Sequence, residues 1–388
     1  MIPLFRLSLR YLLSGKGSTL LVSLIAFLGV VLSVSALLLT MGVFAGFQQA
    51  LREKILSASP HIIVSFLSYE KSKEYNKTIA QTKGIERSYS VLLYNGLISK
   101  EGRLNSVGVK ALEPEDAYKI YGLNLREGIL VGRGLADILG LNVGDEVMVL
   151  SPMGTRTPFG IVPRARTFVV EGIFQKGVFD KDYATIVMNT QTAIDFFGDS
   201  YQLAGYEIYI KDPYKAQEVK EELEKSLGGV SIVRSWIDLN KPLFNALQLE
   251  KVGIFFVLML MIVVASFNIT SLLFMKVKEK VKDIAVLRTF GLRKKHVVSL
   301  FLLQGLMLGA LGTLVGFLLS LVGGYLINKY RLIRVPADVY LMDHVPVHFE
   351  FSDILFTLIG AVILSLLASL LPAYRASKES IVRVLRNE

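Results

Sequence analysis

Residues 20–47 read LLVSLIAFLGVVLSVSALLLTMGVFAGF, and they lie inside an uncharged run that covers residues 17–51. A helix needs about 20 apolar residues to cross a hydrocarbon core of ~30 Å, so this stretch is long enough to span a membrane. It is also longer than the roughly 7–15 apolar residues of a secretory signal peptide, which favours a retained helix over a cleaved leader. The stretch therefore predicts a membrane protein.

Three more uncharged apolar runs follow, at residues 252–275, 297–328 and 354–372. The chain as a whole is 52% hydrophobic with a mean hydropathy of +0.49, close to a soluble protein, so the apolar residues are concentrated in these runs. We expect an integral membrane α-helical protein with four transmembrane helices. The expected spans are residues 19–47, 251–275, 297–328 and 353–373.

The basic residues predict the orientation of these helices. The segment 276–296 carries eight Lys or Arg against two acidic residues, and basic residues also lie in segments 1–18 and 374–388. Short positively charged segments stay in the cytoplasm. We therefore expect cytoplasmic termini, a cytoplasmic 276–296 loop, an outer domain at 48–250 and a short outer loop at 329–352. The net charge of +10 lies beside the apolar runs, which argues against a nucleic-acid partner.

The third run carries small residues at four-residue spacing. Gly312, Gly316, Ser320 and Gly324 follow one another at this interval, and Gly305 and Gly309 precede them. Small residues on one helix face let neighbouring backbones approach closely inside a membrane. We expect this face to pack against another helix.

The outer domain alternates segments typical of strands and of helices. We expect strands at residues 61–65, 104–110, 146–150, 167–172, 185–188 and 207–210, and a helix at 215–227. Two groups of strands are separated by turn-rich sequence, so we expect a large α+β extracytoplasmic domain of two lobes.

One segment of this domain, residues 152–165, is rich in proline and glycine and is expected to form a long loop between two strands. Loops of this length are usually functional or disordered. Two interpretations remain open: a protruding hook that presents Phe159 to a partner, or a loop folded over its own domain.

The sequence contains little that could catalyse a reaction. Cysteine is absent, and residues 15–18 lack the glycine and hydroxyl positions of a phosphate-binding loop. His344 and His348 do not form a zinc motif, and the apolar runs hold no charged residue for a proton relay. We expect no catalytic residues, no metal site and no cofactor bound by this chain, so energy for transport must come from elsewhere.

The basic segment 276–296 has apolar residues at helical spacing and a glycine, Gly291, placed to end a helix. Such a helix either lies on anionic lipid head groups or docks onto a cytoplasmic ATPase.

A family resemblance favours docking. Residues 283–291, DIAVLRTFG, resemble the hallmark of FtsX-like permeases, the MacB-type ABC transporter subunits. The layout of one helix, an outer domain and three helices is similar as well. Over nearly the whole chain the sequence is most similar to the LolC/LolE group of lipoprotein-releasing permeases. The matching stretches are residues 46–47, 60–61, 235–236, 265–269, 371–377 and 384–386. Ile381 departs from the family, which has proline there.

The resemblance implies roles for three sets of residues. TPFGIVP at 157–163 keeps the spacing of the LolC hook that captures the periplasmic carrier LolA, with Phe159 at its tip. The implied hook residues are Pro158, Phe159, Gly160, Ile161, Pro163 and Arg164. The implied ATPase-coupling residues are Asp283, Ile284, Leu287, Arg288, Thr289, Phe290 and Gly291. Candidates for an acyl-chain cavity between the first two helices are Met41, Phe44, Phe47, Phe255, Phe256 and Met259.

The same resemblance implies a bacterial inner-membrane permease that hands triacylated lipoproteins to a LolA-type carrier. A LolD-type ATPase would bind the ATP and magnesium, and a second permease subunit would complete the pair. The 281–291 and 334–353 segments resemble LolE, which leaves open whether that second subunit is identical or LolC/LolE-like. Two alternatives are a MacB-type exporter of peptides or drugs and an FtsX-type scaffold that activates a cell-wall hydrolase.

Overall fold

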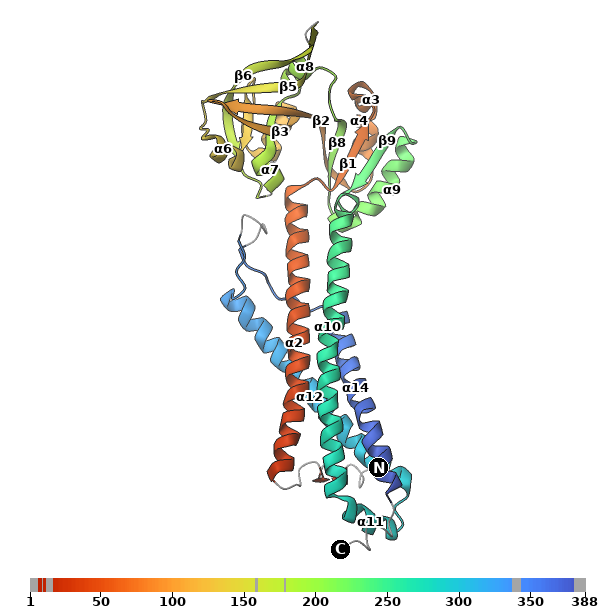
Figure 1. The fold of residues 1–388 in the computed structure, drawn as a ribbon. Coiled ribbons are helices and arrows are strands. Elements are labelled where there is room, and N and C mark those ends of the chain that lie inside the picture. Colours follow the sequence, from red (N-terminus) through yellow and green to blue (C-terminus); the bar gives the residue numbers. More distant parts are fainter. Residues whose placement is uncertain are drawn as a thin grey trace. The chain divides into compact units, whose positions relative to one another are not determined.

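The computed structural model describes residues 6–8, 10–11, 17–157, 160–177, 179–336 and 343–379, with the backbone alone for 17–19, 58, 153–157, 160–162 and 179–180. The chain divides into two compact units (Figure 1). The membrane unit comprises Met1–Ala50, Ala246–Val335 and His344–Glu388, and the outer unit comprises Leu51–Asn245 and Pro336–Asp343.

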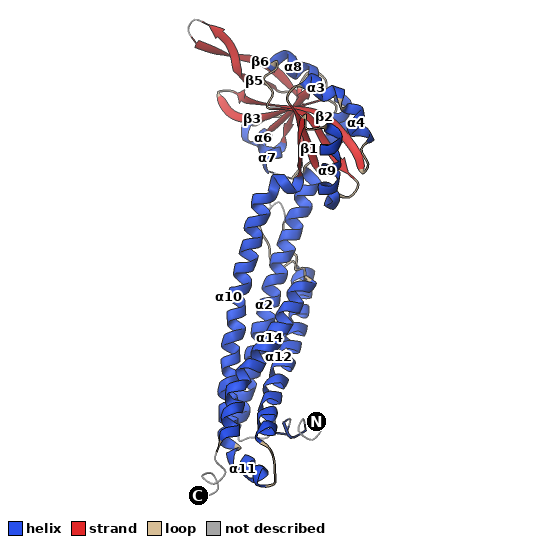
Figure 2. Cartoon of the chain, turned by 90° about the vertical axis from the view of Figure 1, so that its right-hand side faces the viewer, coloured by secondary structure: helices blue, strands red, loops and turns tan. Residues whose placement is uncertain are grey.

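Long helices dominate the membrane unit (Figure 2). They are α2 (Gly17–Ala58), α10 (Trp236–Glu279), α12 (Lys294–Tyr330) and α14 (Phe351–Lys378), joined by the short α11 (Val281–Thr289). All four long helices are apolar enough to cross a membrane. Each of the four expected spans lies within one of these helices.

Two helices exceed the spans expected from the apolar runs. α2 continues eleven residues past residue 47, and α10 begins fifteen residues before 251. A reciprocal cap starts α10: the Asp238 N–H donates to Ser235 Oγ at 3.2 Å, and the Ser235 N–H donates to Asp238 Oδ2 at 3.0 Å. Such a cap satisfies N–H groups that the first helical turn leaves unpaired. The cap, and not the edge of the apolar run, therefore fixes the start of the helix.

The small-residue face of α12 packs against two helices, as predicted. Gly305 and Gly309 lie against Ser369 and Ser365 of α14, where an added Cβ would overlap these side chains. Gly312 and Gly316 lie against Val30, Val31 and Val34 of α2, with an added Cβ at Gly312 only 3.0 Å from Val30. The absence of side chains at these glycines is what permits the close approach.

An extended strap, residues 344–350, crosses the membrane unit before α14. Asn328 holds its middle on both sides, donating to the Val347 carbonyl at 2.9 Å and accepting from the Val347 N–H at 2.7 Å. The His348 N–H donates to the Gly42 carbonyl of α2 at 2.9 Å. At the end of the strap, Glu350 pairs with Lys251 of α10 at 2.6 Å. The strap thus links α2, α10 and α12.

The outer unit is built on one nine-stranded sheet. Its strands are β1 (Ile62–Phe66), β2 (Ile85–Lys100), β3 (Arg103–Leu112), β4 (Ile129–Gly132), β5 (Glu146–Thr157), β6 (Gly160–Phe174), β7 (Thr185–Asn189), β8 (Leu203–Ile210) and β9 (Ser231–Ser235). Its helices are α3 (Tyr69–Glu74), α4 (Asn76–Gln81), α5 (Pro114–Tyr121), α6 (Arg133–Leu139), α7 (Phe179–Ala184), α8 (Thr190–Phe197), the 3-10 turn η1 (Pro213–Lys215) and α9 (Ala216–Leu227).

Part of this sheet closes on itself. The order β3-β7-β4-β6-β5-β2, together with the pairing of β2 with β3, forms a six-stranded ring. A hydrophobic core that includes Val109, Val149 and Phe168 fills this barrel lobe. We call the remainder the open lobe: here β8, β1 and β9 continue the sheet from β2, and their core includes Ile79 of α4 and Leu223 of α9. The two expected lobes therefore have separate cores but share one sheet.

Strand β2 belongs to both lobes. Its first part, from Ile85 to Leu93, pairs with β8, and its second part, from Leu92 to Lys100, pairs with β3. The seam between the lobes lies along this strand.

Candidate hook, lipid-facing and coupling sites

The expected hook is the distal part of a β-hairpin. The β5–β6 ladder continues through the pairs Thr155↔Val162, Arg156↔Ile161 and Thr157↔Gly160. The expectation of a long irregular loop over 152–165 is wrong, because most of these residues are in strands. The two residues that connect the strands, Pro158 and Phe159, lie outside the described residues.

The prolines of this hairpin fit its irregular ladder. Ser151 pairs with Arg164 and Thr155 with Val162, so β5 has two more residues than β6 in this interval. Pro152 lies in the irregular interval, where its missing N–H removes no ladder bond. Pro163 and Arg164 are exposed on the opposite strand. Backbone pairing therefore extends the hairpin, while proline limits further pairing along its edges.

The six acyl-chain candidates do not share one environment. Met41 is only 2% exposed and belongs to the core of the membrane unit, and Phe255 and Met259 pack against that same core. Phe256 is 68% exposed, with its ring 6.1 Å from that of Phe255. Phe44 and Phe47 are half-buried. Phe256 is therefore the candidate most available to lipid, while Met41 contributes to helix packing.

One feature near these residues was not expected from the sequence. Lys251 is buried and pairs with both Glu350 at 2.6 Å and Asp353 at 3.0 Å. The sequence did show that Lys251 precedes the apolar run 252–275 and that Glu350 and Asp353 precede the run 354–372. Only the structure shows that the beginnings of these two runs lie side by side.

The expected coupling segment forms α11 and the turn after it. Ile284 is buried together with its neighbour Ala285, whereas Asp283 and Thr289 are exposed. Leu287 is half-buried. Phe290 is 86% exposed, and Gly291 follows with a φ of +98°. A positive φ is readily available only to glycine, so Gly291 allows the turn that leaves Phe290 in solvent.

Arg288 has a different role from its neighbours. Its Nη1 donates a hydrogen bond at 2.6 Å to the carbonyl of Glu379, the residue that caps α14. A cation near a helix C-terminus satisfies carbonyls that the last turn leaves unpaired. Arg288 therefore ties α11 to α14, and Phe290 is the most exposed apolar residue of the segment, ahead of Val286 at 44%.

Two family models match the chain. Residues 23–226 match the MacB-like periplasmic core domain, and residues 255–381 match the FtsX-like permease C-terminal model.

Several curated proteins are similar to this chain over nearly its full length. The lipoprotein-releasing system transmembrane protein LolC of Neisseria meningitidis is 30% identical, and the match covers 98% of each chain. LolC of Xylella fastidiosa is 29% identical and LolE of Haemophilus influenzae 28% identical, again over 98% of each chain. Among solved structures, the periplasmic region of MacB from Actinobacillus actinomycetemcomitans aligns at 11% identity with a TM-score of 0.33, covering 50% of this chain and 98% of that one.

Proposed function

This chain belongs to the LolC/LolE family of lipoprotein-releasing transmembrane proteins, and from that premise we propose that it is the permease subunit of an ATP-driven lipoprotein transporter. Its role is to extract lipoproteins from the outer leaflet of the inner membrane and pass them to a periplasmic carrier. The observation that supports this most strongly is similarity over 98% of each chain to relatives that carry this name.

Physical chemistry explains why such a permease needs an energy source. Each acyl CH₂ buried in a membrane contributes about 0.8 kcal/mol, so removal of three chains is strongly unfavourable. The proposed transfer path begins on α10, where Phe256 is exposed and Met259 packs on the core beside it. Broad aromatic and flexible thioether side chains suit acyl chains of varied shape.

The partners follow from the same proposal. A LolD-type cytoplasmic ATPase binds ATP and magnesium and docks on α11, and a second permease subunit, identical or LolC/LolE-like, completes the membrane part. The termini lie in the cytoplasm, and the outer unit lies in the periplasm, where it meets a LolA-type carrier. The exposed Phe290 supports docking at α11, because an exposed aromatic side chain is a suitable anchor for a partner.

The decisive experiment is capture of a purified LolA-type carrier by the full-length protein in detergent. The parent is compared with Phe159→Asp, which places a charge at the hairpin tip. Leu104→Asp is the matched control, because Leu104 is an exposed apolar residue near the end of the other hairpin, β2–β3. We expect Phe159→Asp to lose capture and Leu104→Asp to retain it.

Other outcomes would favour the alternatives. If the parent captures no carrier while its ATPase complex still hydrolyses ATP, a MacB-type exporter or an FtsX-type scaffold becomes the better proposal. If Phe159→Asp and Leu104→Asp bind the carrier equally well, the hook is not the contact, although lipoprotein transfer could still occur at another surface.

A further inference from the structure

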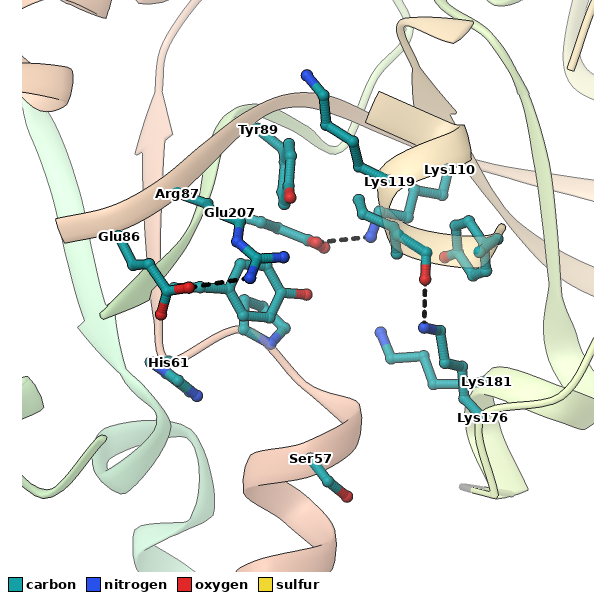
Figure 3. Close-up of a pocket in the computed structure, with 14 residues that line it drawn as sticks. Ser57, His61, Glu86, Arg87, Tyr89, Lys110, Lys119, Lys176, Lys181 and Glu207 are labelled. Carbon is teal, nitrogen blue, oxygen red and sulfur yellow. Dashed lines mark hydrogen bonds and ion pairs between the residues drawn. The ribbon is translucent and has the colours of Figure 1, made fainter. Parts of the chain in front are cut away.

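A pocket of about 220 Å³ lies at the seam between the barrel lobe and the open lobe (Figure 3). The barrel lobe contributes Lys110 from β3 and Lys176 from the segment after β6. The open lobe contributes His61, which immediately precedes β1, and Glu207 from β8. Because both lobes supply its walls, a ligand bound here would contact the two lobes together.

The lining of this pocket is strongly basic. It contains five cationic side chains against two carboxylates, a formal excess of three positive charges. His61 adds no charge, because its Nδ1 accepts a hydrogen bond from the Ile210 N–H at 3.0 Å and burial lowers its pKa. The cationic residues are Arg87, Lys110, Lys119, Lys176 and Lys181.

Both carboxylates are already engaged. Glu207 pairs with Lys110 at 2.5 Å, and both side chains are buried. Burial lowers the pKa of Lys110, but the charge of Glu207 outweighs that effect and raises it, so this lysine stays charged. Glu86 pairs with the adjacent Arg87 at 2.9 Å. The two acids therefore offset two of the five cations, and Asp116 of α5 offsets a third, because it pairs with Lys119 at 3.2 Å.

Lys176 is the cation best placed for a ligand. Its ammonium donates to the Ile120 carbonyl at 2.6 Å and lies 4.9 Å from the centre of the Tyr121 ring, and neither group carries a negative charge (Figure 3). The nearby Asp182 accepts from the backbone N–H groups of Lys176 and Gly177, each at 2.7 Å. Desolvation, and then repulsion from Lys110, lower the pKa of Lys176. The charges of Asp182 and Glu207 act in the opposite direction, and an anion in the pocket would add to them by stabilising the charged ammonium.

We propose that the seam pocket is a binding site for a phosphate group, carried either by a phospholipid head group or by free phosphate. Ammonium groups are compact point charges that bind phosphate oxygens without a fixed orientation. The volume equals that of about seven water molecules at ~30 Å³ each, which is room for a phosphate with a short ester arm. Tyr89 and Tyr209 line the same pocket and supply hydroxyl donors.

The test is calorimetric titration of the full-length protein in a neutral, phosphate-free detergent at low ionic strength, where screening is weak. The two probes are inorganic phosphate and glycerophosphoethanolamine, a soluble phospholipid head group. Lys176→Gln removes the central cation. Lys225→Gln is the matched control, because it makes the same change on exposed α9 outside the pocket.

We expect Lys176→Gln to weaken binding about tenfold or more, the effect of losing one charge-assisted contact, and Lys225→Gln to leave binding unchanged. Binding of glycerophosphoethanolamine alone would identify a lipid head group as the source, whereas binding of both probes would show that free phosphate suffices. The proposal is overturned if neither probe binds the parent, or if Lys176→Gln binds as well as Lys225→Gln.

Unfolding of the variant is checked in the same samples. The melting temperature of Lys176→Gln is compared with that of Lys225→Gln, because the substitution also removes the contacts of Lys176 with the Ile120 carbonyl and the Tyr121 ring. If Lys176→Gln does not fold, Lys119→Gln on α5 provides a second comparison, which removes a pocket cation together with its ion pair to Asp116. Because these titrations use no carrier, ATPase or lipoprotein, their result is independent of the proposed transport function.

Discussion

Arg288 and Phe290 are two residues apart but have opposite surroundings. Arg288 is bonded to the end of α14, while Phe290 is almost fully in solvent. A charge reversal at Arg288 would therefore disturb the membrane unit as well as any docked partner. Phe290 offers a cleaner test of docking, since its removal leaves the internal contacts of α11 in place.

We expect Phe290→Asp to abolish co-purification of the cytoplasmic ATPase while the permease itself still folds. Aromatic anchors account for much of the binding energy of protein interfaces, and truncating one commonly costs about 2 kcal/mol or more. Phe351→Asp is the control, because Phe351 is also exposed but begins α14 at its other end. Unchanged co-purification of Phe290→Asp would favour a helix that lies on lipid instead.

At the residue scale, the sequence predicted the type of site better than its geometry. The exposure of Phe290 agrees with a docking role that residues 283–291 implied. By contrast, Met41 and Phe256 looked equivalent as large apolar residues at similar depth, yet one is buried and the other exposed. The position of a residue along a membrane helix predicts its depth in the bilayer. It does not predict whether the side chain faces the core or the lipid, which depends on how the helix packs against its neighbours.

At the scale of single elements, α12 shows how a spacing pattern becomes a packing surface. Its glycines contact serines of α14 at one end and valines of α2 in the middle. One continuous face therefore serves two partners. The four-residue spacing predicted the face, but it did not reveal that the partner changes along the helix.

We expect Gly309→Leu to destabilise the protein in detergent. The new side chain would overlap Ser365, and overpacking of this kind costs about 1–3 kcal/mol. Gly253→Leu on α10 is the matched control, since nothing lies within 4 Å of its added Cβ. Thermal melting of both variants checks this, and equal melting temperatures would contradict close packing at Gly309.

Strand β2 was not expected, although it is sixteen residues long. Its Asn95-Gly96 pair is typical of a hairpin turn. In the structure these residues lie inside the β2–β3 ladder, opposite Gly108 and Val107. An added Cβ at Gly96 would come within 3.1 Å of the Leu150 carbonyl, so glycine serves close strand packing here. Local turn preference was overridden by tertiary packing, which a single sequence does not reveal.

For the whole molecule, the four apolar runs predicted the membrane helices, and the strand and helix patterns of residues 48–250 predicted the α+β domain. The division of the outer unit into lobes followed from two groups of strands. Closure of the barrel lobe was not predictable, because it depends on pairs such as β4–β6 and β3–β7 that are distant in sequence. The seam pocket was missed for the same reason, since its lysines come from separate elements.

Subunit composition also belongs to this scale. The chain matches relatives named LolC and LolE at nearly equal identity over their full length. We expect it to pair with itself, because this one sequence resembles both LolC and LolE. Two differently tagged copies produced in one cell should therefore co-purify.

Mixing of separately prepared membranes serves as the control for association after solubilisation. Recovery of only one tag, together with a different permease chain, would instead establish a heterodimer.

The shared strand has a consequence for how the outer unit fluctuates. Leu92 is paired with Ala111 in the barrel lobe and with Ala204 in the open lobe, so the two ladders overlap at this position. If β2 unfolds locally in one lobe, the backbone hydrogen bonds that it makes in the other lobe break as well. In hydrogen-exchange terms, the two cores should therefore open as one cooperative unit, with β2 among the last backbone amides to exchange.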